Sequence, residues 1–453
     1  MNDLCIRGGA VVTPEGLLKA DIGIREEAVW EISPRVEAMN YLDAGGAIVL
    51  PGMIDTHVHI RGGAFSHRED FSSGTFAAAC GGVTTILEMP VAKPPASTVE
   101  AFKARRRELE GASCVDVALY GGAGADNLSV MADLAKAGAV AFKTFMMAPP
   151  KGREEEFFGL CAEDDDSLRR VMKAAAGTSL PLAVHAEDNS VIAPLVRELS
   201  GSELADLASW ERSRPAEAET AAVRRVIAAA GETGCRTIIC HTSTREALEM
   251  IRDARRDGVD IYAESCPQYV MLDYENAAPC GVFARIKPPL RSPEAKERLL
   301  EGLCSSMVDF IGSDHAPYRK EEKERGGNIW RTVDGMPGLE FSLLLMANLV
   351  TEGKLTYEHL ARITSGSPAE VFRLSQKGAV KVGLDADLTI LEPVGSWSMK
   401  TTDMKTKSSD SASIFERFSF SHRIAHTLSR GRIVTQRGER EGYQGRFIKP
   451  AVV

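Results

Sequence analysis

The chain contains 453 residues, 44% of them hydrophobic, which is enough to bury a large core and to form more than one domain. Its 54 basic and 63 acidic side chains leave a net charge of −9, so we expect a small-molecule substrate rather than nucleic acid as the binding partner. No apolar run approaches the length that crosses a membrane, so no membrane association is predicted.

Nine cysteines, with no Cys-x-x-Cys pair among them, lie partly within apolar segments. This usage is typical of a reducing compartment, where a free cysteine behaves as a small hydrophobic side chain. The N-terminal residues also lack a charged stretch followed by an apolar one, so no secretory signal is predicted. We therefore expect a cytoplasmic protein.

In chain order, short strands with turns are predicted first, over residues 1–48. From about residue 49 to 350, apolar β-branched runs alternate with segments of helical spacing that often end at glycine. Eight such runs favour a (β/α)8 barrel, with a doubly wound open sheet as the alternative. The predicted strands lie within residues 49–60, 82–90, 115–122, 139–147, 181–187, 236–243, 259–266 and 308–317.

The C-terminal part of the chain is again rich in predicted strands, so both chain ends are expected to combine in one small β-sandwich. Residues 1–50 would form its first part, 51–377 the barrel and 378–453 its second part. The polar run at 398–413 is predicted to be a solvated loop. The predicted fold class is therefore α/β, a (β/α)8 barrel with a small β-sandwich domain formed from both chain ends.

Histidines gather where the predicted barrel strands end. His57 and His59 are two residues apart, so a strand directs both to one face, while His185 and His241 end later strands and Asp314 follows the eighth. In a barrel these ends form one face, which carries the active site. Four imidazoles and a carboxylate suit Zn2+, or alternatively Mn2+, Fe2+ or Co2+.

Lys143 lies at the centre of the apolar fourth strand, AVAFKTFMM, where a buried ammonium is costly. An edge strand, or a side chain that reaches water, would account for it without further chemistry. The predicted metal site favours another explanation, in which the deprotonated amine combines with CO2 to form a carbamate. That anionic group could bridge two cations, and it would remove the buried positive charge.

Motifs along nearly the whole chain resemble the cyclic amidohydrolases, which include hydantoinases, dihydropyrimidinases, allantoinases and dihydroorotases. They are, in order, PGMIDTHVH, FKTFM, VHAED, CHTST, ESCPQY, IKPPLR and SDHAP, followed by KGAVKVGLDADLTIL. The resemblance implies a hydrolase that opens a small cyclic amide at one C–N bond with two divalent metal ions, expected to be zinc. It also implies a homodimer or a homotetramer.

The resemblance further implies roles for the predicted ligands. One metal would be held by His57, His59, Asp314 and Lys143 as its carbamate, and the other by Lys143, His185 and His241. A hydroxide between the metals would attack the substrate. Asp314 would take its proton and pass it to the leaving nitrogen, acting as general base and then as general acid.

The identity of the ring is less constrained. Arg61 stands where dihydroorotases carry an arginine that pairs with a substrate carboxylate, and a rim salt bridge is the alternative. Val91 and Tyr318 replace an asparagine and a histidine of those enzymes, and Ala148 replaces a tyrosine of hydantoinases. Lys287 either adds charge to the pocket or is a solvated loop lysine. We predict substrate contacts for Arg61, Lys287, His315 and Tyr318.

Several functions therefore compete. SRPAEAE, ESCPQY and GGNIW look nearest to allantoinases or hydantoinases, so hydrolysis of a cyclic amide or ureide is the main prediction and a dihydroorotase is the alternative. A non-catalytic dihydropyrimidinase-like scaffold is a third candidate, although every predicted ligand position is filled. A phosphotriesterase-like or deaminase-like hydrolase fits less well, because it does not account for ESCPQY and PPLR.

Overall fold

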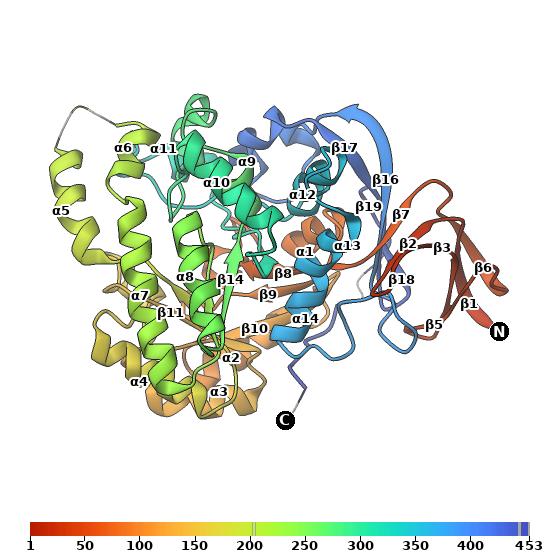
Figure 1. The fold of residues 1–453 in the computed structure, drawn as a ribbon, viewed down its shortest axis with the longest axis horizontal. Helices are drawn as coiled ribbons and strands as arrows, with labels where there is room; N and C mark the ends of the chain where they lie inside the picture. Colours follow the sequence, from red (N-terminus) through yellow and green to blue (C-terminus); the bar gives the residue numbers. More distant parts are fainter. Residues whose placement is uncertain (202, 204, 443–444, 452–453) are drawn as a thin grey trace.

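The computed structural model describes residues 1–201, 203, 205–442 and 445–451 of the chain. A barrel surrounded by helices lies beside a smaller part built from strands (Figure 1). The N-terminus lies at the far end of the smaller part, and the last barrel helices lead the chain back to it (Figure 1). This arrangement follows the predicted order of strands, barrel and strands along the sequence.

Eight parallel strands form the barrel, and their order in the sheet follows the sequence. The first and last strands are joined by a bridge between Val58 and His315, and the His59 amide donates to the His315 carbonyl oxygen at 2.8 Å. The closed sheet confirms the predicted (β/α)8 barrel. Its strands are β8 (Met53–Val58), β9 (Val83–Glu88), β10 (Asp116–Gly122), β11 (Ala141–Phe145), β12 (Leu182–His185), β13 (Thr237–Ile239), β14 (Ile261–Ser265) and β15 (Phe310–Ile311).

Helices connect the strands and cover the outside of the barrel (Figure 1). The main ones are α1 (Phe71–Cys80), α2 (Val99–Leu109), α3 (Met131–Ala137), α4 (Asp165–Ala176), α7 (Ala216–Thr233), α8 (Arg245–Arg256), α10 (Pro293–Cys304) and α12 (Ser342–Thr351). Further helices are α5 (Asn189–Ser200), α6 (Leu207–Arg212), α9 (Pro267–Met271), α11 (Lys320–Glu324), α13 (Tyr357–Ala361) and α14 (Ser367–Val371). Polar side chains cap several N-termini; for example, Asp164 accepts the Ser167 amide at the start of α4. None of the helices within the described ranges combines the length and apolar character of a membrane span.

The smaller part contains two sheets. One has the order β5-β4-β1-β6 and the other has the order β19-β18-β17-β16-β7-β2-β3, which joins strands from both chain ends as predicted. The strands are β1 (Asn2–Arg7), β2 (Ala10–Thr13), β3 (Gly16–Lys19), β4 (Asp21–Arg25), β5 (Ala28–Ser33), β6 (Ala38–Asp43), β7 (Ile48–Pro51), β16 (Leu388–Trp397), β17 (Phe420–Ser429), β18 (Arg432–Gln436) and β19 (Glu439–Arg440). Ile22, Val49 and Leu388 belong to its shared apolar core. The division of the chain at residues 50 and 377 stays a prediction.

The polar run at 398–413 is not the solvated loop that its composition predicts. Thr406, Ser408 and Ser411 are buried, and short 3-10 turns cover Thr401–Asp403 and Ser409–Ser411. The prediction was wrong because small hydroxyl side chains can be buried when each finds a partner. Here the Ser408 hydroxyl donates to the Arg68 carbonyl oxygen at 2.9 Å, so the run is fixed against the barrel.

A buried ion cluster joins the bottom of the barrel to the C-terminal strands. The Lys377 ammonium lies 2.8, 3.1 and 2.5 Å from carboxylate oxygens of Asp116, Asp385 and Asp387. Burial opposes the charge, but these carboxylates outweigh it and raise the pKa of Lys377. Arg430 also contacts Asp116. The three aspartates are close enough to hold a cation, but Lys377 already occupies that role, so we do not interpret them as a metal site.

Candidate metal centre and active site

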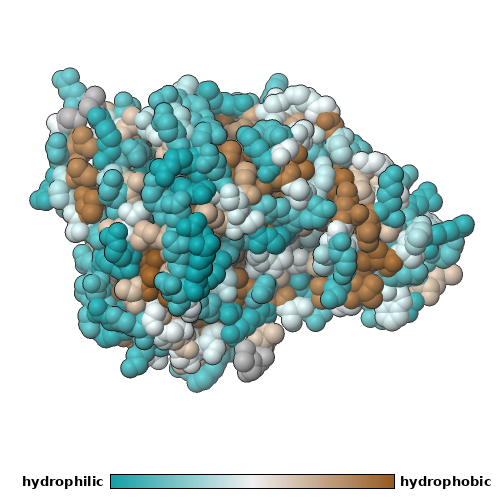
Figure 2. All heavy atoms as spheres, viewed as in Figure 1, coloured by the Kyte–Doolittle hydropathy of each residue, from teal (hydrophilic) through white to brown (hydrophobic). Residues whose placement is uncertain are grey.

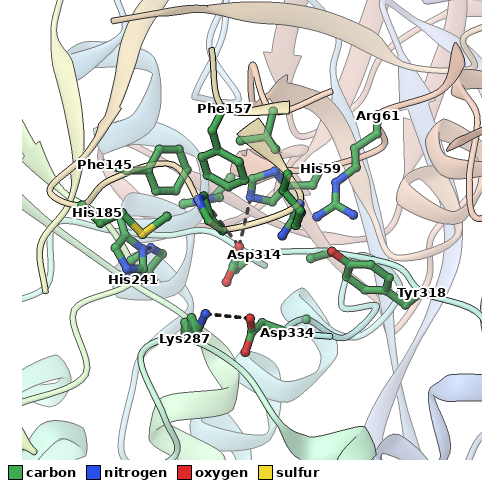
Figure 3. Close-up of a pocket in the computed structure, with 17 residues that line it drawn as sticks. His59, Arg61, Phe145, Phe157, His185, His241, Lys287, Asp314, Tyr318 and Asp334 are labelled. Carbon is green, nitrogen blue, oxygen red and sulfur yellow. Dashed lines mark hydrogen bonds and ion pairs between the residues drawn. The ribbon is translucent and has the colours of Figure 1, made fainter. Parts of the chain in front are cut away.

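The carboxyl ends of the barrel strands bring the predicted ligands to one pocket (Figure 3). His57 and His185 lie at the ends of β8 and β12, whereas His59, His241 and Asp314 lie one to three residues beyond the ends of β8, β13 and β15. All five line the pocket, and Lys143 is fully buried on β11. The structure therefore brings the six predicted ligand residues to the same end of the barrel.

Three of these side chains converge closely enough to hold one cation. Asp314 Oδ1 lies 3.4 Å from Nε2 of both His57 and His59. On the other side of the His57 ring, Nδ1 lies 2.6 Å from Glu264 Oε1, and Glu264 is held in turn by the Thr56 hydroxyl at 2.7 Å. Such a carboxylate fixes the orientation of a histidine and leaves its other nitrogen for a metal.

The remaining histidines form a second group beside the first. His185 Nδ1 and His241 Nε2 are 3.0 Å apart, so their ring nitrogens face one another. The opposite nitrogen of His185 lies 2.8 Å from Glu187, which also accepts a hydrogen bond from Arg214 at 2.7 Å. Lys143 donates to Cys240 Sγ at 2.9 Å and forms no ion pair within the described part of the chain. A thiol is a weak acceptor for a buried ammonium.

Burial and neighbouring carboxylates together set the pKa values of the four histidines. Burial lowers the pKa of His59 to about 3 and also lowers the pKa values of His185 and His241. Burial acts in the same direction on His57, but the neighbouring Glu264 carboxylate outweighs it and raises that pKa to about 10. Neutral imidazoles are the form that binds metal, and His57 can leave its proton on Nδ1, toward Glu264, while Nε2 binds.

The donor set fits two divalent cations. Asp314 is ionised, because His57 and His59 lower its pKa even though burial would raise it. Nε2 of His57 and Nε2 of His59 converge on the Asp314 carboxylate, and Nδ1 of His185 faces Nε2 of His241. These nitrogens lie on the sides of the rings where a bound ion would be held. Imidazole and carboxylate ligands suit zinc and its neighbours in the first transition row.

Three pocket residues adopt left-handed backbone conformations. Arg61, His241 and Asp314 have φ values of 64°, 37° and 48°. Non-glycine residues in this region cost about 1–3 kcal/mol each, and such strain is concentrated at functional sites. The surrounding hydrogen bonds hold Asp314 in place: the preceding Ser313 amide donates to Asp55 at 2.9 Å. These backbone conformations direct the three side chains toward the pocket. The strain lowers the stability of the fold, and the rest of the barrel offsets that loss.

Arg61 and Tyr318 form one charged wall of the pocket (Figure 3). The Arg61 side chain is 4% exposed, and its Nε and Nη1 have no hydrogen-bond partner within the described ranges. Its guanidinium lies 4.8 Å from the centre of the Tyr318 ring, which Arg68 also approaches at 4.5 Å. Burial would raise the pKa of Tyr318, but Arg61, Arg153 and Arg68 lower it. This wall has an excess of positive charge.

Lys287 lines another side of the pocket as half of an ion pair (Figure 3). Its ammonium lies 2.9 Å from Asp334, which also lies 3.2 Å from the buried Arg285. Lys287 is therefore an ion-paired pocket residue rather than a solvated loop lysine, and it shares the single negative charge of Asp334 with Arg285. His315, by contrast, does not line the pocket: its side chain is 0% exposed, and Nδ1 accepts the Gly338 amide at 3.1 Å.

The Amidohydrolase family model matches residues 48–434, which is most of the chain. The chain belongs to the amidohydrolase family. An L-hydantoinase from Paenarthrobacter aurescens is 34% identical over 458 residues, covering 99% of this amidohydrolase and 98% of the relative. An allantoinase from Rubrobacter xylanophilus is 35% identical over 453 residues, covering 99% and 98%. These names fall in the branch that the sequence motifs predicted.

Solved structures agree with this assignment of the amidohydrolase. The L-hydantoinase (dihydropyrimidinase) from Arthrobacter aurescens superposes with a TM-score of 0.94 at 34% identity, covering 99% of this chain and 100% of that one. A dihydropyrimidinase from Brevibacillus agri gives a TM-score of 0.90 at 27% identity, covering 100% and 99%. The likeness therefore extends over both the barrel and the smaller β part.

Sequence reasoning missed the residues that surround the ligands of this amidohydrolase. Glu264 and Glu187 orient His57 and His185, and Asp334 pairs with Lys287. Glu187 follows His185 by two residues, so strand spacing could have assigned it to the same face. Glu264 lies near the end of the seventh barrel strand and could have been recognised in the same way. Nothing local in the sequence pointed to Asp334.

Proposed function

We propose that this amidohydrolase opens a cyclic amide or ureide at one C–N bond, with a chemistry nearest to that of allantoinases and hydantoinases. The convergence of His57, His59, His185, His241 and Asp314 at the bottom of one pocket carries this proposal. Two divalent cations, expected to be zinc, would be held by these residues and Lys143. When bound, such ions lower the pKa of a coordinated water and polarise a carbonyl group.

Asp314 is the proposed proton carrier. Its carboxylate lines the pocket beside His57 and His59. The lowered pKa of Asp314 keeps this carboxylate ionised, and only an ionised carboxylate can accept a proton. From there it would receive the proton of the attacking water and deliver it to the nitrogen that leaves the scissile bond. Glu264 and Glu187 would keep the histidines in the tautomers that leave one nitrogen of each directed inward.

Lys143 is proposed to carry a carbamate. Its neutral amine would add to CO2, forming one N–C bond and releasing one proton, and the product is an anion with two oxygen ligands. The full burial of Lys143, its thiol neighbour Cys240 and the nearby histidines support this modification. An uncompensated ammonium at that position would be costly, whereas a carbamate between two cations would not.

A ring that carries a carboxylate, as dihydroorotate does, is the second candidate substrate. The buried guanidinium of Arg61, with two nitrogens that lack partners in the described ranges, favours it. Lys287 adds less to this argument than Arg61, because it is paired with Asp334, which it shares with Arg285. The aromatic side chains Phe145 and Phe157 line the pocket and would accept an apolar ring substituent instead.

Ring opening by the purified, metal-loaded protein on dihydroorotate, allantoin, a 5-substituted hydantoin and dihydrouracil tests the proposal. We expect at least one ring to be opened, with allantoin or the hydantoin preferred. An Arg61→Met variant should lower kcat/KM for dihydroorotate by about 10-fold or more relative to the uncharged rings if Arg61 binds a carboxylate. Failure on all four rings by protein that contains two metal ions would contradict the assignment.

We further propose that the enzyme works in the cytoplasm as a homodimer or homotetramer. The relatives support this proposal only by analogy. Light scattering on the purified protein would measure the oligomer. A scaffold without catalysis is the competing proposal, and it predicts a protein purified without bound metal.

A further inference from the structure

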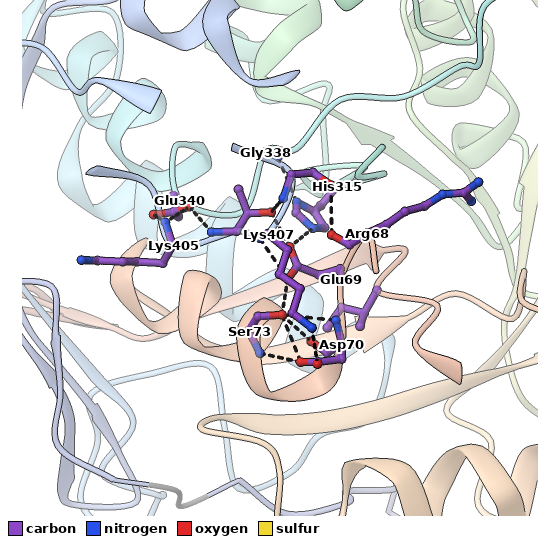
Figure 4. Close-up of polar contacts among 12 residues, drawn as sticks. Arg68, Glu69, Asp70, Ser73, His315, Gly338, Glu340, Lys405 and Lys407 are labelled. Carbon is purple, nitrogen blue, oxygen red and sulfur yellow. Dashed lines mark hydrogen bonds and ion pairs between the residues drawn. The ribbon is translucent and has the colours of Figure 1, made fainter. Parts of the chain in front are cut away.

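Residues 405–410, here called the strap, make polar contacts with Glu69 and Glu340 (Figure 4). They belong to the polar run that the sequence predicted to be a solvated loop. The strap contacts two connecting segments, here called loops: residues 66–70, which lie between β8 and α1, and residues 319–340, which lie after β15 and include the short helix α11. Because β8 and β15 are the first and last barrel strands, the strap spans the seam where the barrel closes.

The strap is bound to the first of these loops mainly through the fully buried Glu69. The Thr406 hydroxyl donates to Glu69 Oε2, and the Lys407 amide donates to Oε1 at 3.3 Å. The Lys407 ammonium reaches the Ser66 carbonyl oxygen at 3.0 Å and Asp70 at 2.5 Å. A carboxylate that is removed from water needs such donors, and within the described part of the chain Glu69 takes all of its hydrogen-bond donors except the Ser73 hydroxyl from the strap.

The strap is bound to the second loop through another buried carboxylate. Glu340 accepts the backbone amides of Lys405 at 2.9 Å and Thr406 at 3.1 Å. Arg319 donates to the Lys407 carbonyl oxygen and lies 3.2 Å from Asp410. Thr406 therefore lies between Glu69 and Glu340 and contacts both, so the two loops share one anchor.

The seam beneath the strap carries catalytic groups on both sides. His59 and Arg61 follow β8, and Asp314 follows β15. His315 lies between them: its carbonyl oxygen accepts the His59 amide, and its ring nitrogen Nε2 lies 3.8 Å from Glu69 Oε2. Since Nδ1 of His315 accepts the Gly338 amide, Nε2 carries the ring proton and faces the carboxylate.

We propose that the strap is a positioning element for the metal centre. Through Glu69 and Glu340 it holds the loop after β8 against the loop after β15, and it thereby fixes the separation of His59 from Asp314. Glu69, Thr406 and His315 are positioning residues in this scheme, and His315 acts from behind the site rather than on the substrate. A segment from the C-terminal part of the chain thus controls the geometry of ligands on the first and last barrel strands.

This inference rests on the proposed metal centre, and its test separates the two. Thr406→Val removes the hydroxyl that Glu69 accepts while keeping the volume, and Thr406→Ser keeps the hydroxyl. Thr402→Val makes the same change at an exposed position of the same run and serves as the control. Each variant would be loaded with Co2+, whose visible absorption reports the coordination geometry, and assayed on the ring that the wild type opens fastest.

For Thr406→Val we expect Co2+ affinity or kcat to fall about 10-fold, with a changed Co2+ spectrum and KM altered less than about twofold. Thr406→Ser and Thr402→Val should match the wild type. Glu69→Gln offers a second route if Thr406→Val does not fold. A lower thermal midpoint with unchanged Co2+ spectrum, affinity and kcat would show a purely structural strap and overturn the inference. If the wild type opens no ring, the Co2+ measurements still decide the question.

Discussion

At the scale of single residues, Asp314 is the most constrained group in the site. Its carboxylate oxygen lies 3.4 Å from two histidine nitrogens, and its backbone has a φ of 48°. Asp314→Asn keeps the size but removes the charge and the base, so we expect kcat to fall at least about 100-fold. Circular dichroism should be unchanged, and metal content would be measured on the same samples. Substantial remaining turnover would rule out Asp314 as the proton carrier.

Lys143 supplies the second prediction at this scale. Lys143→Ala removes the proposed bridging anion, so we expect the protein to lose bound metal and turnover together. A small carboxylate such as propionate should restore part of both, because it can occupy the space of the carbamate. The matched control is Lys136→Ala, at an exposed lysine on α3. Unchanged metal content in Lys143→Ala would exclude a bridging role.

The metal ligands could be predicted from the sequence because five of them lie near the carboxyl ends of apolar strands and Lys143 is a lone charge within one. The spacing of His57 and His59 gives a common face, and barrel topology brings the other strand ends to it. The partners of these ligands could not be predicted as readily. Glu264 contacts His57 across 207 positions of sequence, and Asp334 lies on a long loop whose path follows from packing rather than periodicity.

At the scale of elements, periodic segments were predicted well and irregular ones were not. The eight barrel strands lie where buried β-branched runs were recognised, although β15 has only two residues, Phe310 and Ile311. The run at 398–413 was misjudged because composition reports the polarity of a segment and not its partners. Its hydroxyl groups are matched by buried Glu69 and by carbonyl oxygens that lie far away in the sequence.

The two buried glutamates that bind the strap give a prediction on how stability depends on pH. Burial raises the pKa values of Glu340 and Glu69 to about 7, above their usual value of 4.5. A carboxyl whose folded pKa is raised stabilises the fold below its unfolded pKa, and this contribution is lost as the pH rises to about 7. We therefore expect the free energy of unfolding to decrease between pH 4.5 and 7, by up to about 3 kcal/mol for each carboxyl.

Glu340→Gln should remove one of these two contributions. Thermal midpoints would be measured at pH 5 and pH 7.5, and the difference between them should be smaller in Glu340→Gln than in the wild type. Glu358→Gln, at an exposed position on α13, is the control and should behave as the wild type does. An equal pH dependence in Glu340→Gln and the wild type would mean that Glu340 is already ionised at pH 5.

At the scale of the whole molecule, the C-terminal part of the chain contacts the barrel at both of its faces. Lys377, Arg430 and their aspartate partners join the C-terminal strands to the start of β10, at the face opposite the metal centre. The strap reaches the face that carries the pocket. The C-terminal part is therefore anchored at both ends of the barrel, and the likeness to the L-hydantoinase structure covers 99% of the chain.

Removal of metal should affect function and stability differently at this scale. The barrel core is apolar and extensive, and Glu264 and Glu187 hold His57 and His185 without any ion, so chelator-treated protein should keep its helical circular dichroism. Turnover should be lost. A ligand present at about 1,000 times its dissociation constant stabilises the folded state by about 4 kcal/mol, which in a chain of this size corresponds to a thermal midpoint about 4 °C higher. Added Zn2+ should restore both turnover and the thermal midpoint of the chelator-treated wild type, but it should restore neither in Lys143→Ala. Protein that is purified without metal, and whose midpoint neither chelator nor Zn2+ shifts, would instead support a scaffold built on the same barrel.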